Sequence, residues 1–227
     1  MFVKNNYRFT TPLAMCYFAF YFVAASLTHK FIYIGGHTVS AGSFVMPFWF
    51  MVCDIITEVY GYRQTRFMLW CFLPIQFVFY GILQLFSTIQ PHDTVNGIAY
   101  SMVFGSMLRM AFAIWPALFI AHFLNTYVMS KSKIIFTSRY FWLRSVAAST
   151  AGEILYTAVG FYGILSGTVS TSTLEWMILW GCILKITTTA IIALPVTILI
   201  GALKRAENVD TYDMNIDFNP FKISMSS

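Results

Sequence analysis

The sequence predicts an all-α integral membrane protein, a bundle of six transmembrane helices with both termini in the cytoplasm. Only 10% of its 227 residues are charged, against about a quarter in soluble proteins, and 58% are hydrophobic. Six long apolar runs follow one another, each near the roughly 20 residues that cross a bilayer. Basic residues are also distributed unevenly between the loops. These observations exclude a soluble globule and place any functional site among the helices.

Short polar or glycine-containing connections separate the six runs. We expect spans near Leu13–Ile34, Phe44–Tyr60, Phe67–Phe86, Ala99–Met129, Trp142–Leu165 and Trp176–Leu203. Gly35 and Gly36 follow the first run, which has no small-residue cleavage site and is therefore expected to remain as a helix. A polar segment follows the sixth run. The chain thus divides into a transmembrane domain at 1–207 and a cytoplasmic tail at 208–227, which we expect to be mobile.

The distribution of basic residues sets the predicted orientation. With the N-terminus inside, only Lys30 falls outside, and Arg109 and Lys185 lie in or near spans. The other eleven of the fourteen fall on the cytoplasmic side: Lys4, Arg8, Arg63, Arg66, Lys131, Lys133, Arg139, Arg144, Lys204, Arg205 and Lys222. The positive-inside rule therefore predicts cytoplasmic termini. Six spans would allow two three-helix halves of opposite orientation, although no sequence repeat supports such halves.

The cysteines give no sign of a disulfide framework or a metal site. Each of the four lies inside an apolar run, without ligand-like spacing: Cys16, Cys53, Cys71 and Cys182. We therefore expect buried free thiols, and neither a metal nor a cofactor.

The second run carries a polar stripe on one helical face. Asp54, Thr57 and Glu58 are spaced i, i+3 and i+4, and Phe50 and Pro47 continue the same face. Ionisable groups at membrane depth cost free energy and usually serve function. The stripe therefore predicts a binding site that contains two carboxylates.

Aromatic residues beside this stripe indicate the kind of solute. Trp49 and Phe50 offer flat surfaces, and Pro47 interrupts the helical hydrogen bonds. A carboxylate can accept hydrogen bonds from the ring N–H and exocyclic amine of a guanine-like base, while an aromatic ring stacks on its face. A heteroaromatic base would fit such a site. The structural alternative is that the carboxylates pair with Arg63 or Arg66 and only fix the cytoplasmic turn.

The fifth and sixth runs add further polar groups. The fifth carries Ser149, Thr150, Glu153, Tyr156 and Thr157 at helical spacing. Near the middle of the sixth, Lys185 lies too deep to reach the interface, so we expect one of the carboxylates to be its partner. Both a structural ion pair and a direct role in substrate binding or proton transfer stay open.

The fourth run contributes Arg109, His122 and Asn125, with Pro116 disrupting its backbone. Arg109 either faces the site or reaches the outer interface. Histidine titrates near neutral pH, so His122 would suit proton coupling, but a lone histidine in a helix is more often a structural donor.

Two segments carry a resemblance to a known family. Residues 41–47, AGSFVMP, followed by DIITEVYGY at 54–62 and by Arg66, resemble the signature of the queuosine precursor transporter family, also called the vitamin uptake transporter family. The family pattern agrees in order and spacing at further positions: Arg109, Trp142, Arg144, Glu153, Lys185 and Pro195.

This resemblance implies a bacterial inner-membrane importer of deazaguanine precursors of queuosine, a modified base of transfer RNA, that acts without its own ATPase and is not an enzyme. The implied substrates are bases such as 7-cyano-7-deazaguanine, 7-aminomethyl-7-deazaguanine or queuine. The implied polar pocket comprises Asp54, Thr57, Glu58, Arg109, Glu153 and Lys185, with Trp49 and Phe50 stacking on the base. The expected partners are this small molecule and the bilayer, with a homodimer open and no nucleic acid.

The chain departs from the family pattern at three positions. His122 and Asn125 stand where we expect Gln and Asp, and Tyr156 stands where we expect Asp. Two acidic positions are therefore neutral here. If the acids read the exocyclic groups of the usual precursors, this chain prefers another member of the series, such as queuine, or a related purine.

Two other functions remain as alternatives. Six-helix proteins of this size also serve as substrate-binding membrane subunits of vitamin or purine uptake complexes that need a separate ATPase module. An intramembrane enzyme could use Asp54 with Glu58 or Glu153 as a catalytic pair. The sequence shows no phosphate-binding loop and no nucleophile beside a base, so the enzyme is disfavoured.

Overall fold

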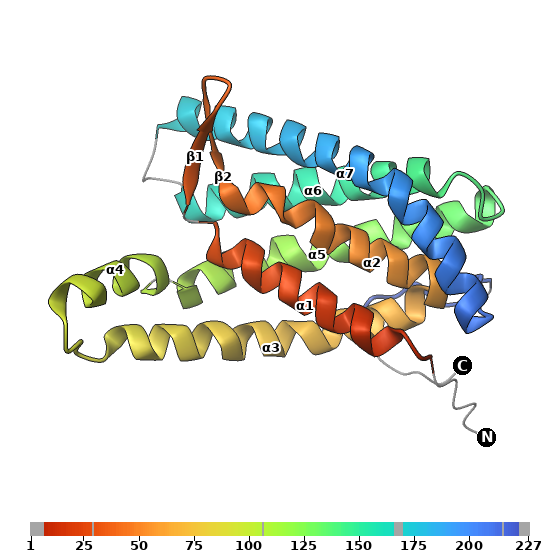
Figure 1. The fold of residues 1–227 in the computed structure, drawn as a ribbon, viewed down its shortest axis with the longest axis horizontal. Helices are drawn as coiled ribbons and strands as arrows, with labels where there is room; N and C mark the ends of the chain where they lie inside the picture. Colours follow the sequence, from red (N-terminus) through yellow and green to blue (C-terminus); the bar gives the residue numbers. More distant parts are fainter. Residues whose placement is uncertain (1–6, 29, 106, 166–169, 215, 223–227) are drawn as a thin grey trace.

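The computed structural model describes residues 7–28, 30–105, 107–165, 170–214 and 216–222. Its α-helices are α1 (Thr10–Ser26), α2 (Met46–Tyr60), α3 (Tyr62–Thr88), α4 (Thr94–Phe104), α5 (Met107–Ile135), α6 (Phe141–Leu165) and α7 (Thr171–Glu207). The long helices lie side by side along one axis, with a small β-hairpin at one end (Figure 1). The predicted helical bundle is confirmed.

Length and hydropathy make this a multi-pass membrane protein. Four helical segments of the described chain are long and apolar enough to cross a bilayer: Ala41–Tyr60, Tyr62–Thr88, Thr94–Ile135 and Thr171–Glu207. Helix α1, with 17 residues, is a shorter apolar helix. Helix α6 spans 25 residues and is not among these four segments; it carries Ser, Thr and Glu side chains. These polar side chains belong to the candidate site described below.

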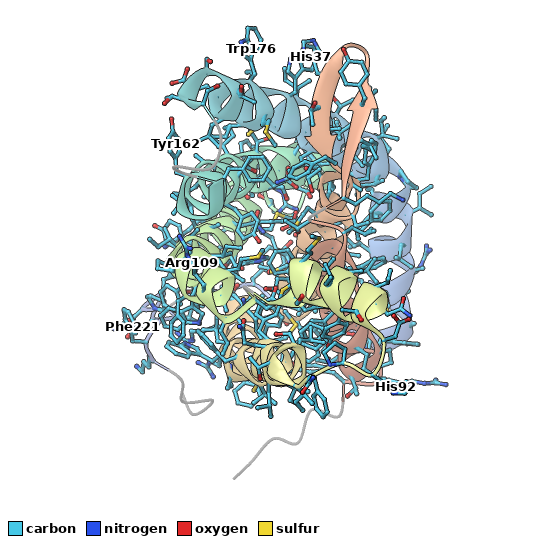
Figure 2. All side chains as sticks on the ribbon, turned by 90° about the vertical axis from the view of Figure 1, so that its left-hand side faces the viewer. His37, His92, Arg109, Tyr162, Trp176 and Phe221 are labelled. Atoms are coloured by element: carbon cyan, nitrogen blue, oxygen red, sulfur yellow. The ribbon has the colours of Figure 1, made fainter. Side chains whose placement is uncertain are left out.

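The first apolar run is not helical throughout. Helix α1 ends at Ser26, and Phe31–Ile34 forms strand β1, which pairs antiparallel with β2 (His37–Ser40). Gly35 and Gly36 form the turn with positive φ, and the β-branched and aromatic residues of β1 favour a strand. The expectation of helix up to Ile34 was therefore wrong. His37 of this hairpin stacks on Trp180 of α7, with Trp176 beside it (Figure 2).

Helix α2 is the central element of the bundle. It follows the 3-10 helix η1 (Ala41–Phe44) and contacts α1, α3, α5, α6 and α7. Every residue of α2 except Phe48 is buried. Its two carboxylates are therefore enclosed by protein on all sides.

The start of α1 and the end of α7 lie at the same end of the bundle. The backbone N–H of Phe9 donates to Glu207 Oε1 at 2.7 Å, and the Tyr60 hydroxyl donates to the same oxygen at 2.9 Å. The described basic residues predicted to be cytoplasmic belong to this end, at the start of α1, α3 and α6, the ends of α5 and α7, and the tail (Figure 1). We call it the basic end. Lys30 and Arg109 belong to the opposite end, and Lys4 lies outside the described residues.

The described residues of the C-terminal tail, 208–214 and 216–222, are packed against the basic end. Asp213 is buried, and its Oδ2 accepts hydrogen bonds from the Tyr62 backbone N–H at 2.8 Å and from the Ser130 hydroxyl. It thereby caps α3 from far along the chain. Gly61, the residue before α3, has φ +86°, and a Cβ there would lie 2.7 Å from Asp213 Oδ1. The tight α2–α3 turn and the tail are therefore fitted to each other.

Further along the tail, side chains of α3 bind its backbone. The Arg66 guanidinium donates to the carbonyl oxygens of Asp217 and Asn219, at 2.9 and 2.8 Å. The Trp70 indole N–H donates to the carbonyl of Pro220 at 2.6 Å. The tail thus ties α3 and α5 together at the basic end.

We expect Asp213→Ala to loosen this end of the bundle. The substitution leaves the Tyr62 N–H and the Ser130 hydroxyl without their shared acceptor, which should cost about 1–3 kcal/mol. A lower melting temperature in detergent, with faster proteolysis after residue 207, is the expected result. Asp217→Ala is the matched control, because the Asp217 side chain is half exposed and Arg66 binds only its backbone. Equal behaviour of the two variants would contradict the capping role.

Candidate functional site

Asp54 lies at the centre of a buried hydrogen-bond network. Its Oδ1 accepts from the Asn125 side-chain amide at 2.7 Å. Its Oδ2 accepts from the hydroxyls of Ser145 and Ser149, at 2.5 and 3.0 Å. All four side chains are almost fully buried, and they come from α2, α5 and α6. Neutral donors alone therefore satisfy this carboxylate.

Ser145 was missed by the sequence analysis. It lies four residues before Ser149, which in turn lies four before Glu153, so the three share one face of α6. That spacing was visible in the sequence. The spacing does not show which neighbouring helix this face of α6 contacts.

An aromatic wall stands beside the Asp54 network. The Phe50 ring stacks on the His122 ring, with centroids 4.3 Å apart and an interplanar angle of 16°. The ring centroids of Trp49 and His122 lie 4.1 Å apart. The Tyr156 ring meets the Phe50 ring edge-on, with centroids 6.5 Å apart. The structure thus brings together four predicted site residues from α2, α5 and α6.

His122 is held from a further helix. Its Nδ1 lies 3.5 Å from the hydroxyl of Tyr17 in α1, at the limit of a hydrogen bond. Its buried Nε2 has no hydrogen-bond partner within the described residues. Tyr17 was not predicted, because one aromatic residue in a long apolar run carries no distinguishing signal.

Glu153 and Lys185 lie on the α7 side of this cluster. Glu153 Oε1 accepts from the Thr189 hydroxyl at 3.2 Å, while its buried Oε2 has no partner in the described part of the chain. Lys185 Nζ donates to the Thr157 hydroxyl at 2.7 Å and lies 5.6 Å from the centre of the Tyr156 ring. No carboxylate of the described residues lies within ion-pair distance of this ammonium, contrary to the expected pairing.

Close helix contact at Gly152 brings these groups together. A Cβ at this position would lie 2.9 Å from the Ala121 carbonyl oxygen, 3.0 Å from Phe50 Cε1 and 3.3 Å from Asn125 Cβ. Only glycine lets α6 approach α5 and α2 this closely. Gly152 thus lies against the Asn125 turn of α5, and Glu153 follows it on α6.

A small cavity leads from the hairpin end toward Lys185. It has a volume of about 30 Å³, close to that of one water molecule. Its walls come from the turn after α1, from β2 and η1, and from helices α2, α5, α6 and α7; they include Thr28, Ser40, Gly42, Ser43, Met46, Ile114, Tyr156, Gly160, Phe161 and Lys185. The cavity lies on the side of the bundle away from the basic end. In this conformation it is too small for a bicyclic base.

Two predicted pocket residues lie elsewhere. Thr57 turns toward α3, where its hydroxyl donates to the Cys53 carbonyl at 2.8 Å and lies 3.1 Å from the Thr65 hydroxyl. Arg109 is exposed near the start of α5, at the periphery of the bundle (Figure 2). The structure therefore does not bring either of them to the Asp54 cluster, and a position of Arg109 at the outer membrane interface stays a prediction.

Glu58 belongs to a separate ionic cluster at the basic end. Its Oε2 lies 3.0 Å from Arg144 Nη2, and its Oε1 accepts from Lys204 Nζ at 2.6 Å. Ser138 donates to Oε1 at 2.9 Å. Lys133 Nζ lies 3.9 Å from the same oxygen and donates to the Glu58 backbone carbonyl at 2.5 Å. Glu58 thus pairs with cations, as the structural alternative proposed, but through α5, α6 and α7.

Asp210 of the tail completes this cluster. It lies 2.5 Å from Lys133 Nζ and 2.9 Å from Lys204 Nζ. Burial opposes ionisation of Asp210, but the hydrogen bonds from the two lysines outweigh it and hold the pKa of this carboxyl below its ordinary value. Three cations therefore share two carboxylates, and the tail takes part in closing the basic end.

The described cysteines and other metal-ligating side chains do not gather into a metal site. Within the residues that the structure describes, no three His, Cys, Asp or Glu side chains lie close enough to hold a metal ion. All four cysteines are free thiols, but only Cys53 and Cys182 are buried, so the expected burial of Cys16 was wrong.

Comparison with known proteins decides the family. Residues 40–200, which run from the end of β2 into α7, match the family described as "Putative vitamin uptake transporter". The chain belongs to this family. The match contains every predicted site residue on α2, α5, α6 and α7, whereas Tyr17 and the tail lie outside it.

A curated relative has a more specific name, which also describes a transporter. The protein of Bacillus subtilis (strain 168) named "Probable queuosine precursor transporter" is 28% identical over 144 residues. The aligned part covers 60% of this chain and 62% of the relative. No solved structure matches the chain significantly. This member of the vitamin uptake transporter family is therefore similar to a transporter along about three fifths of its length.

Glu58→Gln should destabilise the protein. The change leaves Arg144, Lys133 and Lys204 with Asp210 as their remaining carboxylate in this cluster, and breaking a buried ion pair costs about 3–5 kcal/mol. We expect lower membrane yield and a lower melting temperature. Glu175→Gln makes the same chemical change at an exposed position near the start of α7 and should be silent. A Glu58→Gln protein as stable as this control would show that Asp210 balances the cations unaided.

Proposed function

We propose that this chain imports deazaguanine bases that serve as queuosine precursors, and holds them between α2, α5, α6 and α7. The observation that carries the proposal is the cluster around Phe50, where flat aromatic side chains and buried acceptors meet at membrane depth. The family supplies transport as the activity. The name of the Bacillus subtilis relative supports the substrate class.

The chemistry of the cluster matches such a base. A deazaguanine offers a flat bicyclic face, which aromatic side chains such as Phe50 and Tyr156 can contact. Its ring N–H and exocyclic amine need acceptors, and the buried atoms without a partner in the described chain include two carbonyl or carboxylate oxygens of predicted site residues, Asn125 Oδ1 and Glu153 Oε2. An unsatisfied buried acceptor costs about 1–3 kcal/mol. A ligand that supplied the missing donors would relieve this cost.

The direction of transport follows from the two ends of the bundle. In the proposed arrangement six segments span the inner membrane of a bacterium, with the basic end and both termini in the cytoplasm. The Glu58 cluster and the tail close that end, whereas the small cavity approaches Lys185 from the opposite end. A solute would therefore enter from outside, and release would require the basic end to open.

The first test is rescue of queuosine in transfer RNA. The host is a bacterium that cannot make the base and lacks its own importer, and it expresses only this chain and receives each precursor at low concentration. We expect rescue by wild type and by Glu175→Gln, and none by Asp54→Asn at equal membrane abundance. Rescue without an added ATPase argues against a partner-dependent subunit. Failure with every precursor, despite confirmed expression, would overturn the proposed function.

Lys185→Met separates transport from folding. No described carboxylate forms an ion pair with Lys185, so removing its ammonium leaves no ion-pair partner behind. We expect near-normal yield and melting temperature together with a loss of uptake, because the ammonium lines the cavity that leads into the cluster. Lys222→Met, at the exposed end of the tail, should leave both unchanged. A large fall in yield for Lys185→Met would assign the lysine a structural role instead.

A further inference from the structure

We infer that Asn125, not Asp54, reads the donor edge of the solute, and that Asp54 acts by fixing the orientation of the Asn125 amide. This inference rests on the proposed function and names the specificity-determining group of that same site. It reverses the assignment that the sequence favours, in which the carboxylate itself grips the base.

The hydrogen bonds of Asp54 leave little capacity for a ligand. A carboxylate offers about four acceptor positions. Three are taken by protein donors: two on Oδ2, from Ser145 and Ser149, and one on Oδ1, from Asn125. A bidentate grip on a ring N–H and an exocyclic amine needs one free position on each oxygen. Asp54 therefore cannot supply that grip while the network is intact.

The same network imposes one orientation on the Asn125 amide. Its Nδ2 donates to Asp54, so Oδ1 faces the other way. The flipped amide would set its oxygen against the carboxylate and lose this hydrogen bond. Asn125 is fully buried, and Oδ1 has no partner in the described part of the chain. Asp54 thus fixes the Asn125 side chain in the one amide orientation that leaves its oxygen available as an acceptor.

Two other predicted site residues also carry a buried polar atom that is unsatisfied within the described chain. Glu153 Oε2 and His122 Nε2 also lack partners among the described residues. His122 lies one turn before Asn125 on α5 and stacks on Phe50. Glu153 follows Gly152, whose Cβ position lies 3.3 Å from Asn125 Cβ. The fixed acceptor on Asn125, together with the unsatisfied carboxylate oxygen of Glu153 on α6, favours a flat solute with at least two donors, such as a lactam with a 2-amino group.

Binding of two probes to purified protein tests this assignment. The probes are 7-cyano-7-deazaguanine and its analogue without the 2-amino group, measured by calorimetry in detergent. We expect wild type to bind the aminated probe about tenfold or more tightly. Asn125→Leu should lose this preference although Asp54 is still present. If Asp54 itself read the amine, Asn125→Leu would keep the preference, and the inference would be wrong.

A charge swap gives an independent answer. In Asp54→Asn/Asn125→Asp, the new amide at 54 can accept from the two serines and donate to the new carboxylate at 125, which still presents an acceptor to the solute. We expect the double variant to recover the preference that Asp54→Asn alone loses. A double variant no better than Asp54→Asn would overturn the inference. The swap also decides the question if Asn125→Leu does not fold.

The outcomes distinguish this inference from the proposed function. Wild-type protein that binds both probes equally would refute the reading by Asn125 and leave a deazaguanine transporter standing. Protein that binds neither these probes nor queuine would refute both. Glu175→Gln, an acid-to-amide change far from the site, should reproduce the wild-type affinity ratio and serves as the control for Asp54→Asn.

Discussion

Helix α2 carries two carboxylates, Asp54 and Glu58, that protein surrounds on all sides. Much of the structure depends on the partners that stabilise them. Asp54 is satisfied by an amide and two hydroxyls, all neutral. Glu58, one turn along α2, is matched by three cations. Desolvating a charge without such partners is among the largest costs a protein can meet. The partners come from α5, α6, α7 and the α5–α6 connection, so satisfying α2 also assembles the bundle.

The neutral network around Asp54 and the ionic cluster around Glu58 lie at different levels along the bundle axis. Around Asp54 the hydrogen-bond donors are neutral, so its network can orient groups toward a solute without a direct ion pair to Asp54. Long-range attraction between full charges is instead kept at the basic end, where Asp210 joins the network from the tail. Because Asp54 and Glu58 share one rigid helix, the cations that hold Glu58 also fix the depth of Asp54 in the bundle.

The sequence predicted the helices and the polar faces well because both follow from local patterns. Hydropathy located the long spans, and helical spacing placed Asp54, Glu153 and Lys185 in the interior. Spacing alone could not show that Thr57 turns to α3, because i+3 neighbours still diverge around a helix. Short apolar segments such as Phe31–Ile34 do not distinguish strand from helix. The role of Asp213 depends on Tyr62, 151 residues away, which no local pattern contains.

The substitution of an amide for an acid at position 125 has a physical logic of its own. A carboxylate there would face Asp54 at hydrogen-bond distance, and two like charges so close repel strongly. An amide instead donates to Asp54 through its nitrogen and presents its oxygen to the solute. The solute therefore still meets a hydrogen-bond acceptor. Compared with an acid at this position, the amide therefore keeps an acceptor in the site while avoiding a second buried charge. In this arrangement, selectivity comes from the orientation of one amide, which the carboxylate and two serines behind it maintain.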